Sequence, residues 1–327
     1  MSDTIKVGVV GVGALGKHHA RLYKECAGAE LVGVYDRHAE TAAAVAAELG
    51  VRAFATIEAL AAAADGLSVA VPTDHHHRVA KPLLQQGKHI LVEKPITVTV
   101  AEGEELVRLA AASKLVLQVG HVERYNPVLE CLDCTPGEAR FIEAHRLAPY
   151  PPPRPGLRPR GTEVSVVLDL MIHDLDVILY LVRSPVKQVD AVGVPILSPS
   201  EDIANARIAF ENGCVANVTA SRVSQERMRK IRVFKTAAYL SLDYQTQKGE
   251  MVMLDLPKMA LSRQEVGVMA ANALQLELQD FVNCIRAVRE TGVVPEPKVS
   301  GEAGLQALCL AEQILAKVRE QARPAAR

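Results

Sequence analysis

The first third of the chain alternates short apolar runs with stretches of helix-forming composition. The run Ile5–Val10 is rich in Val, which is typical of a strand buried on both faces. Strands that alternate with helices in this way predict an α/β domain with a doubly wound parallel sheet. The further predicted strands are residues 31–35, a short one near Ala53, 66–71, 89–92 and 115–119.

The second half of the chain changes to a period of two. Every other residue from Ala204 to Phe210 is apolar, and Asn212-Gly213 then predicts a hairpin turn. The alternation resumes after the turn and continues to Tyr244. We therefore expect a C-terminal α+β domain with a largely antiparallel open sheet and helices on one face. The predicted domains are residues 1–122 and 123–327, and the last two predicted helices are 274–289 and 301–318.

Composition narrows the class of protein. A chain of 327 residues with 49% hydrophobic content can bury two cores. The net charge of −1 predicts neither nucleic-acid nor membrane-surface binding. No targeting segment or long uncharged apolar run is evident, so we expect a cytoplasmic protein. Its six cysteines are expected to be reduced, and Cys131-x-x-Cys134 has no second pair to complete a zinc site.

The glycine-rich turn after the first strand is the strongest signal of chemistry. In Gly11-x-Gly13-x-x-Gly16, the first glycine makes the tight turn and the second lets backbone N–H groups approach a pyrophosphate. The third lets the following helix pack closely on the strand. Asp36 ends the second strand twenty residues later, where a carboxylate can hold the ribose 2′-OH of NAD. Arg37 keeps NADP open, and a strand-to-helix turn without ligand is the structural alternative.

Two further segments follow strands of the predicted parallel sheet. Pro72-Thr73-Asp74 precedes three adjacent histidines, which point about 100° apart on a helix and cannot easily share a metal ion. We therefore predict a helix start capped by Thr73 or Asp74, with one histidine facing the cofactor, and no metal site. Glu93-Lys94-Pro95 follows the fifth strand, and ligands bind at such strand ends. A solvated surface role for Lys94 is the alternative.

A helix predicted over residues 163–182 carries polar residues at helical spacing. Asp169, His173, Asp176 and Tyr180 are expected on one face. A carboxylate one turn from a histidine can orient the ring and raise its basicity, so this pair suits acid–base catalysis. A hydrated helix face is the alternative.

A proline-rich segment precedes this helix. Residues 149–161 carry Arg154, Arg158 and Arg160, and their proline content excludes a helix or a central strand. The segment is either a solvated connector or an arginine clamp for an anionic substrate such as a diphosphate. His121 and Arg124, after the sixth strand, are expected near the cleft mouth or in ordinary structural hydrogen bonds.

With these motifs the chain resembles the glucose-fructose oxidoreductase/inositol dehydrogenase (Gfo/Idh/MocA) family over nearly its whole length. The resemblance rests on the glycine turn followed by His19, on Glu93-Lys94-Pro95, and on Asp169-x-x-x-His173. It implies an NAD(P)-dependent sugar or polyol dehydrogenase with Lys94, Asp169 and His173 as catalytic residues. His76 also falls at the family's position after the fourth strand. The expected cofactor contacts are Gly11, Gly13, Ala14, Leu15, Asp36, Arg37, Pro72, Thr73, His76, Glu93 and Lys94.

The segment from Gly120 to Pro127 resembles that of a subgroup, the UDP-N-acetylglucosamine 3-dehydrogenases. These enzymes make a 3-oxo sugar used for diamino-sugar lipid A or related glycans. The resemblance implies a nucleotide-sugar substrate and suits an arginine clamp. The expected substrate contacts are Arg124, Tyr125, Arg154, Arg158, Arg160 and His173.

Three other functions remain open from the sequence. They are oxidation of a free sugar or inositol, glycoside cleavage through transient oxidation by NAD, and cofactor sensing without chemistry. A broad one-sided sheet often buries its other face against a second subunit, so we expect a homodimer or homotetramer through the C-terminal sheet.

Overall fold

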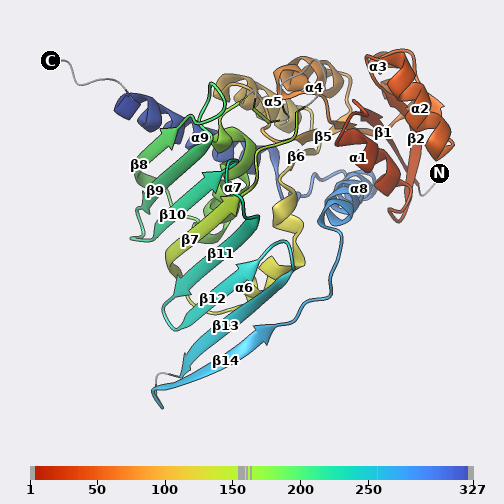
Figure 1. The fold of residues 1–327 in the computed structure, drawn as a ribbon. Coiled ribbons are helices and arrows are strands. Elements are labelled where there is room, and N and C mark those ends of the chain that lie inside the picture. Colours follow the sequence, from red (N-terminus) through yellow and green to blue (C-terminus); the bar gives the residue numbers. More distant parts are fainter. Residues whose placement is uncertain (1–3, 154–158, 160, 163, 256, 323–327) are drawn as a thin grey trace. The chain divides into compact units, whose positions relative to one another are not determined.

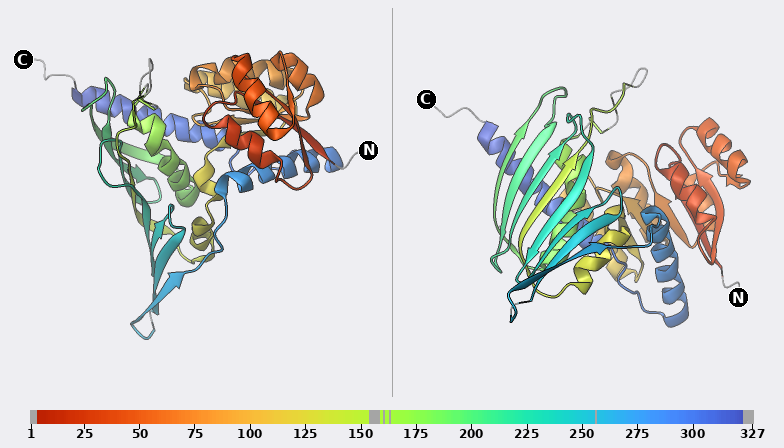
Figure 2. Two further views of the ribbon diagram at one scale, coloured as in Figure 1. Left: turned by 45° about the vertical axis from the view of Figure 1, so that its right-hand side comes forward. Right: turned by 60° about the horizontal axis from the view of Figure 1, so that its bottom comes forward.

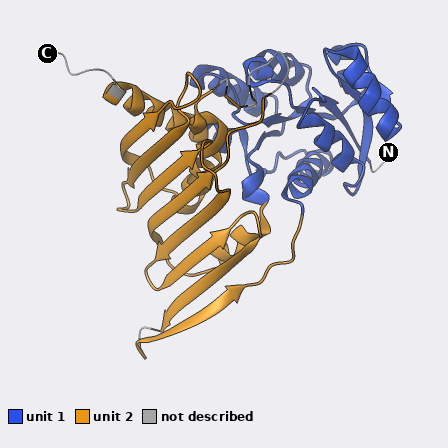
Figure 3. Ribbon diagram, viewed as in Figure 1, with its two compact units in different colours: residues 1–125, 272–305 blue, residues 126–271, 306–327 orange. Residues whose placement is uncertain are grey.

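The computed structural model describes residues 4–153, 159, 161–162, 164–255 and 257–322. The chain forms two compact units (Figure 3). Unit 1 comprises residues 1–125 and 272–305, and unit 2 comprises 126–271 and 306–327. The division differs from the predicted domains, because residues 272–305 belong to the first unit rather than the second. Helix α8 (Ala273–Thr291) explains the difference, since its buried Leu278 and Phe281 complete the core around β1 (Ile5–Val10).

Unit 1 contains the predicted parallel sheet (Figure 1). Its six strands have the order β3-β2-β1-β4-β5-β6, and every pair is parallel. The reversal of strand order beside β1 creates the edge at which α/β sheets bind ligands. The other strands are β2 Ala29–Tyr35, β3 Arg52–Ala53, β4 Gly66–Val69, β5 His89–Glu93 and β6 Leu117–Gly120. The helices before β6 are α1 Gly16–Tyr23, α2 Ala39–Leu49, α3 Ile57–Ala63, α4 His76–Gln85 and α5 Val100–Ala112.

Unit 2 contains the predicted open sheet, in the order β14-β13-β12-β11-β7-β10-β9-β8. The pair β7–β10 is parallel, and the other neighbouring strands are antiparallel. Figure 2 shows helices packed on one face of this sheet. The first strands are β7 Ala139–Leu147, β8 Val186–Val194, β9 Ile203–Phe210 and β10 Val215–Ser221. The last strands are β11 Met228–Lys235, β12 Ala238–Asp243, β13 Lys248–Asp255 and β14 Ala260–Val266. The helices are α6 Glu130–Cys134, α7 Ile172–Val182 and α9 Gly301–Ala322, of which 301–305 belong to unit 1.

The period-two pattern predicts the burial of these strands correctly. Ala206 and Ile208 of β9 are fully buried, while Asn205 and Arg207 between them are exposed. Gly213 lies in the hairpin turn with φ +83°, a conformation that favours glycine. Within the described residues, no helix has both the length and the apolar composition needed to cross a membrane.

The helix that carries Asp169 differs from the prediction. Residues Val167–Met171 form a π-helical turn, which leads into α7. The prediction of one uninterrupted α-helix over residues 163–182 is therefore wrong, because the extra residue per turn changes the register before His173. π-Turns of this kind occur frequently at functional sites.

Candidate active site

The glycine turn of unit 1 has the geometry that its sequence predicts. Gly11 adopts φ +85°, and its N–H donates to the Tyr35 carbonyl at 2.8 Å. A Cβ atom on Gly16 would collide with the Gly11 carbonyl, so only glycine allows α1 to lie so close to β1. A Cβ atom on Gly13 would meet no atom of the described residues within 4 Å. Gly11 and Gly16 thus have structural roles, whereas the space beside Gly13 is available to a ligand.

The start of α1 fits an anionic group. Ala14 and Leu15 connect Gly13 to the helix, and Leu15 is the N-cap residue, whose side chain makes no capping hydrogen bond. The first turn carries no acidic residue. Helix N-termini attract phosphate through unpaired N–H groups and the helix dipole. These features fit the pyrophosphate of a dinucleotide.

The Asp36 carboxylate lies against this turn. Its Oδ2 accepts the Val12 N–H at 2.9 Å, and its Oδ1 accepts the His38 N–H at 2.9 Å. Each oxygen keeps further lone pairs for a hydroxyl group. The Arg37 Nε–H donates to His38 Nε2 at 3.0 Å on the exposed surface. Asp36 therefore stabilises the turn and is still able to accept a ribose hydroxyl.

Among the described residues, no group of three or more His, Cys, Asp or Glu side chains is arranged so that it could hold a metal ion. Residues Thr73–His75 form a 3-10 turn after Pro72, and α4 starts only at His76. The predicted cap is therefore wrong, since neither Thr73 nor Asp74 caps α4.

The His76 ring is buried beyond that turn. It lies 2.9 Å from both the Val71 and the Pro95 carbonyl oxygens. Burial lowers the pKa of His76, which favours the neutral ring. His76 thus joins the loops that follow β4 and β5.

A buried contact between the side chains of His19 and Glu93 lies at the end of β5, next to Lys94 in the chain. His19 Nε2 is 2.9 Å from Glu93 Oε1, and the Lys94 N–H donates to Glu93 Oε2 at 3.2 Å. Burial opposes ionisation of Glu93, but His19 and Lys94 hold the pKa of the carboxyl below its usual value. A Cβ on Gly120 would lie 3.0 Å from Glu93 Oε2, so glycine makes room for this carboxylate. Glu93 thereby fixes the backbone of Lys94.

The segment after β6 contributes to the interior of unit 1. Burial lowers the pKa of His121 to about 3, and the nearby charge of Lys94 acts in the same direction. Arg124 donates to the Lys298 carbonyl at 2.7 Å, and the Tyr125 hydroxyl donates to Asp280 at 2.7 Å. The Arg124 hydrogen bond is structural, as the alternative interpretation expects, and the roles of Arg124 and Tyr125 in substrate binding stay predictions.

In unit 2, Asp169 lies in the π-turn, and His173 lies in the helix α7 that follows directly. The bare Cα of Gly161 faces this carboxylate, since a Cβ there would contact Asp169 Oδ2. Asp176 is buried, and the Tyr180 hydroxyl donates to the Asp133 carboxylate at 2.9 Å. Tyr180 therefore links α7 to α6. The predicted clamp residues Arg154, Arg158 and Arg160 lie outside the described residues.

Two buried arginines support the Asp169–His173 segment, and sequence reasoning missed both. Arg146 of β7 makes a bidentate pair with Asp174 at 2.8 and 3.0 Å, which anchors α7 on the sheet. Arg222, directly after β10, pairs with Asp202 at 2.8 Å. Each arginine occurs at or beyond the end of an alternating strand, where a charged residue normally indicates exposure. No signal in a single sequence marks them as buried.

Comparisons with known proteins agree with this architecture. The profile of an oxidoreductase family with an NAD-binding Rossmann fold matches residues 5–121, and the GFO/IDH/MocA C-terminal domain matches 135–241. The UDP-N-acetylglucosamine 3-dehydrogenase of Acidithiobacillus ferrooxidans is 38% identical over 317 residues, 95% of this chain and 96% of that protein. A solved structure of that enzyme aligns with a TM-score of 0.88 at 36% identity, covering 97% and 98% of the two chains.

More distant relatives share parts of the chain or its fold. The inositol 2-dehydrogenase of Corynebacterium glutamicum is 33% identical over 201 residues, 58% of each chain. Levoglucosan dehydrogenase, solved with NADH and L-sorbose, has a TM-score of 0.84 at 18% identity over 98% of both chains, which shows the fold alone. The two profiles and the full-length relative establish that this chain belongs to the Gfo/Idh/MocA family of oxidoreductases.

Proposed function

We propose that this enzyme oxidises the C3 hydroxyl of UDP-N-acetylglucosamine to the 3-oxo sugar, with NAD as hydride acceptor. The observation that carries the proposal is the 38% identity, over 95% of the chain, to an enzyme of that name. The inositol dehydrogenases match a smaller share of the chain at lower identity. The glycine turn, with open space beside Gly13 and an uncapped start of α1 among the described residues, supports the cofactor assignment.

Three side chains would carry out the proton chemistry. His173 accepts the hydroxyl proton, Asp169 orients the imidazole and raises its basicity, and Lys94 assists at the oxygen. The bound nicotinamide would supply the acceptor for the hydrogen that leaves carbon as hydride. The His19–Glu93 pair supports this assignment of Lys94, because it fixes the backbone from which the side chain extends.

The cofactor is proposed to be NAD rather than NADP. A second negative charge at the ribose 2′-position would lie close to the Asp36 carboxylate, which the Val12 and His38 N–H groups hold in place. Like charges brought together in this way disfavour the phosphorylated cofactor.

The function is tested by mixing the purified protein with NAD or NADP and a panel of sugars. The panel comprises UDP-N-acetylglucosamine, UDP-glucose, UDP-N-acetylgalactosamine, free N-acetylglucosamine and myo-inositol. We expect reduced cofactor to form with UDP-N-acetylglucosamine and a 3-oxo sugar to be detected by mass spectrometry. Turnover with inositol alone would favour the inositol alternative. Release of UDP without net cofactor reduction would favour transient oxidation, and cofactor binding without turnover would favour a sensor.

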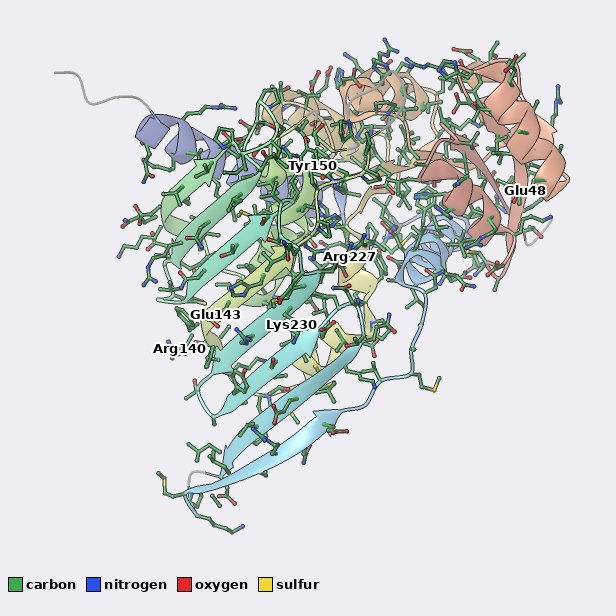
Figure 4. The ribbon with its side chains drawn as sticks, in the orientation of Figure 1. Glu48, Arg140, Glu143, Tyr150, Arg227 and Lys230 are labelled. Carbon is green, nitrogen blue, oxygen red and sulfur yellow. The ribbon has the colours of Figure 1, made fainter. Side chains whose placement is uncertain are left out.

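We also propose a cytoplasmic homodimer or homotetramer that associates through the open face of the unit 2 sheet. Phe141, Phe234 and Tyr239 form a row across three strands, with ring centroids 5.8 and 4.9 Å apart. Phe234 is 37% exposed. Figure 4 shows Glu143 and Lys230 on neighbouring strands of the same sheet. An apolar row bordered by charged groups resembles the core and rim of a subunit interface.

A further inference from the structure

The guanidinium of Arg222 is extensively hydrogen-bonded in the region that precedes the candidate catalytic helix. The residue is 2% exposed. An arginine has five N–H donors, and here five hydrogen bonds use them. Because the guanidinium is planar and rigid, a guanidinium with all its N–H groups hydrogen-bonded fixes the relative positions of the groups that it contacts. Its acceptors are Asp202 Oδ1, the carbonyl oxygens of Gly161 and Val164, and the hydroxyls of Ser198 and Ser200.

Asp202 balances the charge of Arg222 and extends the network. Its Oδ2 accepts the backbone N–H groups of Ile196, Leu197 and Ser198 at 2.8, 2.6 and 2.9 Å. Burial opposes ionisation of Asp202, but the Ser198 and Arg222 hydrogen bonds hold the pKa of the carboxyl well below its usual range. The pair is therefore ionised on both sides, and it ties two segments of unit 2 to the end of β10.

The network reaches Asp169 through Gly161. Arg222 holds the Gly161 and Val164 carbonyls, so the chain is fixed at two points before the π-turn. Gly161 has φ +84°, and a Cβ there would contact Asp169 Oδ2 and lie 3.0 Å from Cγ. The backbone of Gly161 thus forms one wall of the space that the Asp169 carboxylate occupies.

We propose that Arg222 and Asp202 are positioning residues for catalysis. They hold Gly161 against the Asp169 carboxylate and thereby set the orientation of that carboxylate toward its partner. This inference rests on the proposed roles of Asp169 and His173. A buried ion pair is a costly way to secure a loop, because both charges lose their hydration. Accurate placement of a carboxylate is a use that simple loop closure would not require.

The test compares Gly161→Ala with Gly213→Ala. Both glycines have the same backbone strain, with φ +84° and +83°, but a Cβ on Gly213 meets no described atom within 4 Å. We expect Gly161→Ala to lower kcat at least about tenfold while the Kd of the cofactor stays unchanged. The acidic limb of its kcat/KM profile should move to lower pH, because the base loses the carboxylate that raises its pKa. Gly213→Ala should change neither property.

Arg222→Lys provides a second variant if Gly161→Ala does not fold. Lysine keeps a positive charge opposite Asp202 but lacks the planar guanidinium and its five N–H donors. We therefore expect the same change in kcat and in the pH profile. Combining either variant with Asp169→Asn should add little to the effect of Asp169→Asn alone, because both act through one carboxylate.

Three results would overturn the inference, and the first two show whether the proposed function fails with it. If Asp169→Asn lowers turnover while Gly161→Ala and Arg222→Lys behave like Gly213→Ala, the positioning role is refuted and the proposed function stands. If Asp169→Asn leaves turnover unchanged, the catalytic assignment itself fails and the inference falls with it. Fully additive effects in the double variants would also refute the positioning role.

Discussion

Gly13 and Gly16 are separated by two residues, yet alanine at each position should affect different properties. Gly13 does not adopt positive φ, and its Cβ would meet no described atom within 4 Å. Gly13→Ala should therefore stabilise the fold by about 0.4–1 kcal/mol, because alanine restricts the unfolded chain. Gly16→Ala places a methyl group against the Gly11 carbonyl of the adjoining turn. Overpacking of this kind costs about 1–3 kcal/mol or more, which lowers Tm by roughly 2–12 °C for a unit of this size.

The affinity for NADH should respond mainly to the change at Gly13, in contrast to stability, which should fall with the change at Gly16. A methyl on Gly13 occupies the space proposed for the pyrophosphate, so we expect NADH affinity to fall at least about tenfold, or about 1.4 kcal/mol. Thermal unfolding without cofactor and fluorescence titration with NADH measure the two effects separately. Wild-type NADH affinity in Gly13→Ala would refute the placement of the cofactor at this turn. An unchanged Tm in Gly16→Ala would refute the close-packing argument.

Four further outcomes are expected. Asp174→Asn leaves a buried arginine without its counter-charge and should lower the free energy of unfolding by about 3–5 kcal/mol in urea, while exposed Asp190→Asn should change it by less than about 0.5 kcal/mol. The pKa of His121 is about 3 in the folded protein, below its unfolded value of about 6.5, so the unfolded state binds the proton first. Stability should thus fall by about 2 kcal/mol between pH 6.5 and 5, and His121→Asn should reduce that loss. Asp36→Ala should shift the ratio of NADP to NAD affinity at least about tenfold toward NADP, as calorimetry would show. Phe234→Lys should reduce the mass measured by light scattering, whereas an unchanged mass would place the subunit interface elsewhere.

The sequence by itself determined the elements whose cause is local. The glycine turn could be predicted in detail because positive φ at Gly11 and close approach at Gly16 are backbone requirements that only glycine meets. The unit 2 sheet could be predicted because alternation places one set of side chains in the core. The Gly120–Pro127 segment indicated the subgroup that the full-length relative also represents.

The tertiary structure decided which elements pack together and which charges are buried. An amphipathic helix such as α8 shows an apolar face in its sequence but does not show which sheet receives it, so residues 272–305 could not be assigned to unit 1. The π-turn at Val167–Met171 likewise interrupts a segment whose sequence predicts a continuous helix. Arg222 illustrates the limit most clearly, because its five acceptors come from separate segments of the chain. Only folding brings those groups to one guanidinium and makes its burial favourable.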